Sequence, residues 1–151
     1  MSVTRTETAA ELVVAQVSAV RIACRRITGA HLKALRDSVE QACRIPAAMP
    51  WDRKAMAHAE FFNALADVVG DHLVAPVLSG GAGLSYDLMA AAGGQAEAMI
   101  LGSRRSFLAH LQTGDAEAAA LEMERHLDVL YYMWHLGSQS SSGNATYGLI
   151  S

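Results

Sequence analysis

The stretch that decides the fold is Ser103–Leu127, SRRSFLAHLQTGDAEAAALEMERHL, in which two helical patterns flank a Thr-Gly-Asp turn. The first helix is predicted to end at Gln112, because Thr113-Gly114 interrupts its pattern. Asp115 then predicts the N-cap of a second helix. A stripe of inward-facing residues follows at helical spacing, at Ala119, Met123, His126, Leu130 and Met133.

Helical periodicity extends from this stretch over nearly the whole chain, which contains only three prolines. Six helices are predicted, over residues 9–27, 29–45, 51–69, 71–92, 95–112 and 116–136. The connections between them are short, which is typical of an all-α antiparallel bundle. The run SGGAG at 79–83 lies inside the fourth helix, where each glycine costs about 1 kcal/mol relative to alanine. It therefore predicts a kink, a break or a place where a large group packs against bare backbone.

The two ends of the chain differ in composition from the rest. Residues 1–8 are polar, and we expect them to be disordered. The tail at 137–151, GSQSSSGNATYGLIS, is rich in Ser and Gly and is also predicted to be disordered. The sequence thus predicts one ordered domain over residues 9–136.

Length, charge and cysteine usage narrow the class of protein. A chain of 151 residues predicts a single domain. The net charge of −3 and the scattered basic residues provide no basic stripe that would hold DNA. The polar N-terminus resembles no signal peptide and no stretch is apolar enough to span a membrane, so we expect a cytoplasmic protein. Cys24 and Cys43 form no CxxC motif and are expected to be buried free thiols.

Three polar residues on predicted inward faces are the candidates for chemistry, namely His58, Arg104 and His126. His58 shares its helix face with Phe62. A lone histidine on an apolar face is most often a hydrogen-bonded core residue, but two histidines and an arginine on separate helices favour an interior polar site. Imidazole can bind a metal and guanidinium can hold a carboxylate. A buried, unpaired arginine would require an anionic partner.

No catalytic motif accompanies these residues, because the chain lacks GxSxG, P-loop, GxGxxG and HExxH patterns. We therefore expect no enzyme. Glu122 precedes His126 by one helical turn and either orients the imidazole or forms a surface pair with it, the surface pair being favoured. A metalloenzyme built on His58, His126 and Glu122 would lack both a complete ligand set and a nucleophile.

Three local strings resemble the effector-binding C-terminal domain, or FCD domain, of GntR-family transcription regulators. RRITGAHLKAL at 25–35 is similar to the family pattern ERATxEDLxxL. HAEFFNALADVVGD at 58–71 is similar to DxxFHxALAxAxGN. The stretch at 103–127 is similar to EHRxILxAIxxGDxxxAxxxMxxHL and is the most specific of the three. The resemblance covers residues 9–136.

This resemblance implies a bundle of six or seven helices with a central cavity for a small organic acid, and a homodimer. It also implies a preceding winged helix-turn-helix domain through which alone the protein would contact DNA. That domain is absent from this chain, so we expect either an isolated effector domain or a protein that has lost its DNA-binding half. The alternative to a sensor is a stand-alone helical dimerisation or interaction module without a ligand.

The metal-binding members of the family use one aspartate and three histidines. By resemblance these correspond to His58, Phe62, Arg104 and His126 in this sequence, so that only the last histidine is unchanged. Any residual metal site would have only His58 and His126, and we expect no metal cofactor. Arg104 is predicted instead to bind the effector carboxylate, with hydrogen bonds from His58 and His126 and an apolar wall from Phe62. The alternative is that Arg104 points outward and the cavity has collapsed.

Overall fold

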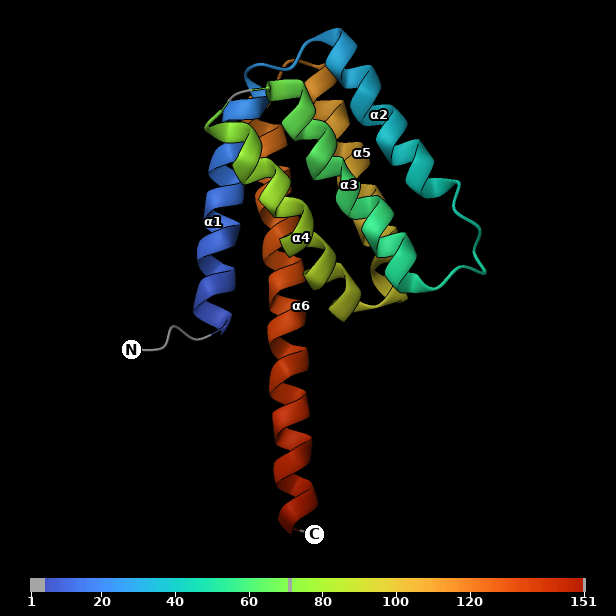
Figure 1. Ribbon diagram of the computed structural model, residues 1–151, viewed down its shortest axis with the longest axis vertical. Helices are drawn as coiled ribbons and strands as arrows, with labels where there is room; N and C mark the ends of the chain where they lie inside the picture. Colours follow the sequence, from blue (N-terminus) through green and yellow to red (C-terminus); the bar gives the residue numbers. More distant parts are fainter. Residues whose placement is uncertain (1–4, 71, 151) are drawn as a thin grey trace.

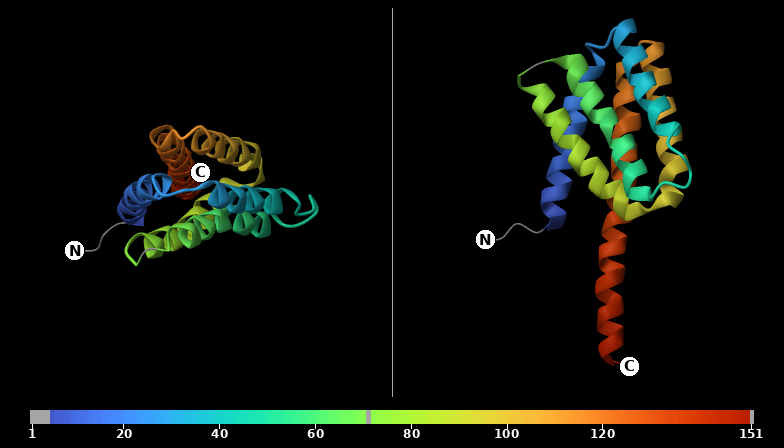
Figure 2. Two further views of the ribbon diagram at one scale, coloured as in Figure 1. Left: turned by 90° about the horizontal axis from the view of Figure 1, so that it is seen from above. Right: turned by 45° about the vertical axis from the view of Figure 1, so that its right-hand side comes forward.

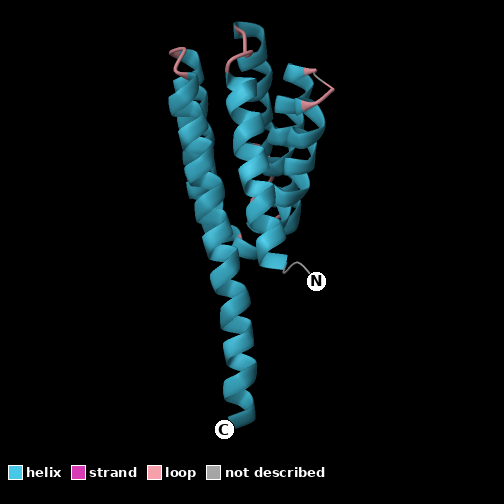
Figure 3. Ribbon diagram, turned by 90° about the vertical axis from the view of Figure 1, so that its left-hand side faces the viewer, coloured by secondary structure: helices cyan, strands magenta, loops and turns pink. Residues whose placement is uncertain are grey.

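The computed structural model describes the backbone of residues 5–70 and 72–150, and the side chains of residues 10–70 and 72–137. Over this part of the chain it contains six α-helices, one short 3-10 turn and no strand, which confirms the predicted all-α class (Figure 3). In chain order the elements are α1 (Arg5–Cys24), α2 (Gly29–Cys43), α3 (Trp51–Val69), α4 (Val74–Ala92), η1 (Gly94–Ala96), α5 (Glu97–Gln112) and α6 (Ala116–Ile150).

The helices lie side by side in a bundle, and α6 packs against three of the other helices (Figure 1). This helix packs against α1, α4 and α5, while α3 packs against α2 and α4. The C-terminal part of α6 extends well past the other helices, as both Figure 1 and the right view of Figure 2 show. None of the described helices is long and apolar enough to cross a membrane.

Local sequence explains several helix ends. The Asp115 carboxylate accepts a hydrogen bond from the backbone N–H of Ala118, 3.0 Å away, and so caps α6 as predicted. At the start of α2, the imidazole Nδ1 of His31 accepts the N–H of Thr28 at 3.1 Å, a role that Glu or Gln plays in a capping box. Gly114 has φ +77°, a left-handed conformation that glycine adopts without steric cost.

The glycine-rich segment of α4 does not break the helix, which runs continuously from Val74 to Ala92. Gln16 of α1 lies directly against Gly81, where a Cβ atom would overlap its side-chain amide. The same amide donates a hydrogen bond to the carbonyl of Val77. Of the three alternatives that the sequence left open, close packing against bare backbone is therefore the one observed.

Other boundaries differ from the predicted ones. Helix α1 begins at Arg5, within the segment predicted to be disordered, and ends at Cys24 rather than at residue 27. Helix α6 continues through the predicted disordered tail to Ile150. Elongating an existing helix needs no new nucleation and the tail contains no proline, so serine and glycine weaken this helix without ending it. The division into one domain over residues 9–136 stays a prediction.

The two cysteines do not share one environment. Cys24 is buried in α1, and burial raises the pKa of its thiol to about 12, so it stays protonated. Cys43 is exposed at the end of α2, which contradicts the expectation of two buried thiols. The apolar stripe of α2 passes through Leu35, Val39 and Ala42, and the next residue falls on the outer face.

Candidate functional site

The four residues predicted to bind a ligand come from three helices and are all buried. His58 and Phe62 lie on α3, Arg104 on α5 and His126 on α6. Their exposed fractions are 3%, 0%, 1% and 2%, so Arg104 does not point outward as the alternative prediction had it. Helical spacing explains the burial, because each residue lies on the inward stripe of its helix.

Arg104 is the most unusual of the four, since its guanidinium lies among apolar groups. Its central carbon is 4.7 Å from the ring centroid of Phe61 and 5.3 Å from that of Phe62. One terminal nitrogen donates to the carbonyl of His58 at 3.4 Å, another lies 3.9 Å from the sulfur of Met123, and Nε has no partner. Among the side chains that the structure describes, no carboxylate pairs with it.

Burial lowers the pKa of Arg104 to about 9. The guanidinium is nevertheless almost fully protonated at neutral pH. The aromatic faces of Phe61 and Phe62 stabilise it partly through cation–π attraction. The site therefore contains a buried positive charge without a counter-charge, a costly arrangement unless an anion joins it.

His58 is held by Glu97, which in turn pairs with Lys54, and the sequence analysis missed both residues. Its Nε2 lies 3.1 Å from the carboxylate of Glu97, and that carboxylate lies 3.5 Å from Nζ of Lys54. Burial lowers the pKa of His58 more than the Glu97 hydrogen bond raises it, so a neutral imidazole donates its N–H to Glu97. Glu97 lies two helical turns before Arg104 on α5, and this spacing is the signal that could have found it.

Among the residues that the structure describes, His126 has no hydrogen-bond partner at either ring nitrogen. Burial lowers its pKa well below the usual value, and the nearby positive charge of Arg104 acts in the same direction. The neutral ring lines a pocket of about 230 Å³ between α5 and α6, here called the α5–α6 pocket. The residues that line this pocket are Met99, Ser103, Glu122, Arg125, His126 and Val129.

The predicted surface pair between Glu122 and His126 does not form. Glu122 is largely buried, and its carboxylate instead pairs with the exposed Arg125 at 3.1 Å. His126 is one helical turn away but lies deeper in the bundle. The imidazole therefore depends on no carboxylate of its own helix.

The side chains at the four family ligand positions do not fit a divalent cation. Phe62 offers no donor atom, and the buried guanidinium of Arg104 would repel a metal ion held by its neighbours. In the described part of the chain, no group of three or more His, Cys, Asp or Glu residues is placed to hold a metal. What these positions offer instead is one fixed positive charge beside two neutral imidazoles.

A comparison with known family models gives a match over most of the chain. The family model described as the FCD domain matches residues 16–129, well over half of the chain. The matched segment includes all four predicted site residues. No curated protein and no solved structure gives a significant match to the chain.

Proposed function

Because the chain belongs to the FCD domain family, the ligand-sensing C-terminal domains of GntR-family regulators, we propose that it binds a small organic acid inside its helical bundle. The acid would act as an effector that controls DNA binding by a winged helix-turn-helix domain outside these 151 residues. The coupling between the two sites is allosteric and runs through a homodimer. The proposal places the protein in the cytoplasm and assigns it no enzymatic activity.

One observation carries this proposal, namely the buried guanidinium of Arg104 without a carboxylate partner among the described side chains. A guanidinium recognises a carboxylate through two parallel hydrogen bonds. Nε of Arg104 lacks a partner in the structure, and the contacts of its terminal nitrogens, at 3.4 Å and 3.9 Å, are long. The ligand carboxylate would supply the missing charge and the missing acceptors together.

The neighbouring residues have complementary roles in this proposal. Neutral His126 donates an N–H to the ligand, and both of its ring nitrogens lack a partner in the structure. His58 adds a second imidazole, whose orientation Glu97 maintains. Phe62 supplies the apolar wall. Since the guanidinium is closely packed, the aromatic rings around it must shift when an acid enters, and this movement provides a signal to the rest of the bundle.

The test is a calorimetric titration with a panel of mono-, di- and tricarboxylates. We expect at least one acid to bind the wild-type protein, and its affinity for Arg104→Met to be lower by a factor of about 100 or more. This factor corresponds to the loss of a buried charge-assisted pair of about 3 kcal/mol. Arg105→Met is the matched control, because Arg105 is the exposed neighbour on α5. Equal binding of every acid by Arg104→Met and wild type would remove Arg104 from the site.

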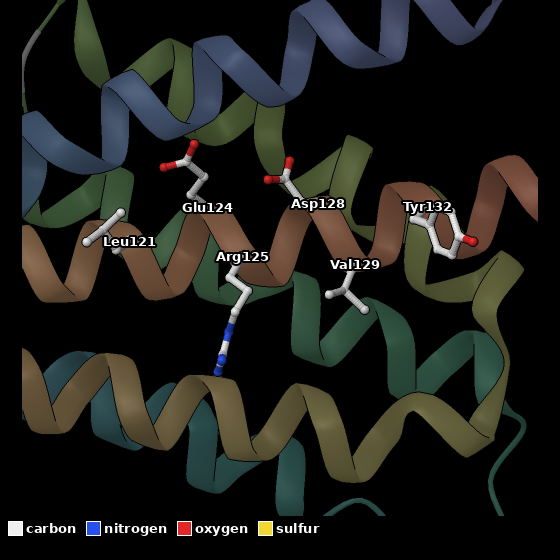
Figure 4. A pocket seen from close by; sticks show the side chains of 6 residues that line it. All are labelled: Leu121, Glu124, Arg125, Asp128, Val129 and Tyr132. Carbon is white, nitrogen blue, oxygen red and sulfur yellow. The ribbon is translucent and has the colours of Figure 1, made fainter.

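A second candidate function, a helical dimerisation module without a ligand, is favoured by the outer face of α6. Leu121, Val129 and Tyr132 are 58%, 40% and 61% exposed on this helix. Figure 4 shows these residues along α6, with Glu124 and Asp128 toward α1 and Arg125 toward α5, and together they line a shallow surface pocket. Light scattering of wild type and Tyr132→Glu tests it: a monomeric variant that still binds acids would separate dimerisation from sensing.

A further inference from the structure

The α5–α6 pocket is a second place where the protein can hold a small molecule. Arg104 is not among the residues that line it. Its volume of about 230 Å³ is below the roughly 300–1,000 Å³ typical of pockets for drug-sized ligands. A ligand of few non-hydrogen atoms would therefore fill it.

Two residues that line the pocket carry three buried polar atoms without a hydrogen-bond partner among the described residues, the hydroxyl oxygen of Ser103 and both ring nitrogens of His126. Ser103 is 9% exposed and His126 is 2% exposed, so bulk water does not solvate them freely. A buried polar group without a hydrogen-bond partner destabilises the folded state. Hydrogen bonds from a bound ligand would remove this cost, which indicates that the pocket accepts a polar group at its inner end.

The charges at the pocket decide which kind of ligand fits. The carboxylate of Glu122, with 8% of its side chain exposed, pairs with the guanidinium of Arg125, with 76% exposed. Figure 4 shows Arg125 reaching from α6 toward α5. A purely cationic ligand would meet the positive charge of Arg125, and a purely anionic ligand would meet the carboxylate of Glu122. A zwitterion matches both charges.

We infer that the α5–α6 pocket binds a small α-amino acid, with its ammonium group on Glu122, Ser103 and His126 and its carboxylate on Arg125. An ammonium group has three N–H donors, and these three residues provide one acceptor each, the imidazole through its unprotonated nitrogen. The Arg125 side chain is largely exposed, so its guanidinium can turn from Glu122 to the ligand carboxylate. Met99 and Val129 provide the apolar contacts for the amino-acid side chain.

The experiment is a thermal-shift screen of the purified chain against each of the common L-amino acids, followed by calorimetry of those that raise the melting temperature. Each binder is compared with two analogues, one without the amino group and one without the carboxylate. We expect each analogue to bind more weakly by at least about tenfold. We expect Glu122→Gln and Ser103→Ala to weaken the amino acid and Glu124→Gln, a matched change on the same helix, to leave its affinity unchanged.

Three outcomes would overturn the inference: no amino acid binds, the deaminated acid binds as well as the amino acid, or Glu122→Gln binds as wild type does. If Glu122→Gln fails to fold, Ser103→Ala still tests the inference, because removing one hydroxyl group leaves the shape of the pocket intact. The inference shares His126 with the proposed function, but Glu122 and Ser103, the residues that test it, have no part in that function. If acids bind through Arg104 while amino acids do not bind, only the inference fails, and the reverse result would reject only the organic-acid sensor.

Discussion

Replacing Arg104 by methionine should make the ligand-free protein more stable. Burial lowers the pKa of Arg104 to about 9, roughly three and a half pKa units below the usual arginine value. At about 1.4 kcal/mol per pKa unit, keeping this guanidinium charged costs the folded state about 5 kcal/mol. Methionine has a similar length, no charge and enough flexibility to fill the space between the phenylalanine rings.

Part of this gain is lost with the contacts of the guanidinium. The faces of Phe61 and Phe62 contribute about 1 kcal/mol each through cation–π attraction, and the bond to the carbonyl of His58 contributes about 1 kcal/mol. The net expectation is therefore that Arg104→Met raises the free energy of unfolding by about 2 kcal/mol, or the melting temperature by about 4–8 °C for a chain of this size.

Urea unfolding at pH 7.5, followed by far-ultraviolet circular dichroism, measures this difference directly, provided that the slope against denaturant is the same in both proteins. Arg105→Met, a change at an exposed position, should stay within about 0.5 kcal/mol of wild type. A variant less stable than wild type by about 1 kcal/mol or more would refute the reasoning, since the guanidinium would then be well compensated without an anion.

Three further predictions concern other parts of the fold. Burial lowers the pKa values of His58 and His126, so below about pH 6.5 the unfolded chain binds more protons than the folded one. The free energy of unfolding should therefore be constant with respect to these two groups above about pH 7 and fall below about pH 6.5, by up to 1.4 kcal/mol per pH unit for each group. Urea titrations of His126→Asn at several pH values should show a shallower fall. Gly81→Ala should lower the free energy of unfolding by about 1–3 kcal/mol, because the added Cβ overlaps the buried Gln16 amide. Gly80→Ala, at an open helical position, should raise it by up to about 1 kcal/mol. Equal effects of the two substitutions would contradict the close packing at Gly81. Asp115→Ala should cost about 1 kcal/mol through loss of the α6 cap, and no change in calorimetric melting would argue against that cap.

Local signals allowed much of this fold to be predicted from the sequence. Helix α3 runs from Trp51 to Val69 as predicted, because Pro50 precedes it and a left-handed Gly70 ends it. Helical periodicity predicted the burial of His58, whereas for Arg104 it left an outward orientation open, which the structure excludes. In these cases the determining residues lie within one or two helical turns of the feature that they control.

The features that could not be predicted depend on which helices become neighbours. Gly81 is packed because Gln16, 65 positions earlier, lies on the facing helix. His58 hydrogen-bonds to Glu97 across α3 and α5; the spacing from Arg104 places Glu97 on the same face of α5 but does not identify His58 as its partner. The partner of Glu122 was predicted wrongly for a related reason, since Arg125 and His126 are both close in sequence and only tertiary burial separates them.

The charge of Arg104 links stability to the proposed sensing function. The buried guanidinium lowers the stability of the ligand-free protein by several kcal/mol. An anionic ligand therefore binds much more strongly to a conformation in which it can neutralise this charge than to one in which it cannot. A ligand can shift a conformational equilibrium only by its difference in affinity for the two states. A fully compensated arginine would leave little such difference, and an exposed one would bind its anion mainly through weak, screened attraction. Burial without a carboxylate partner therefore suits a sensor better than a structural core, because the ion pair that would stabilise the charge forms only when the ligand binds.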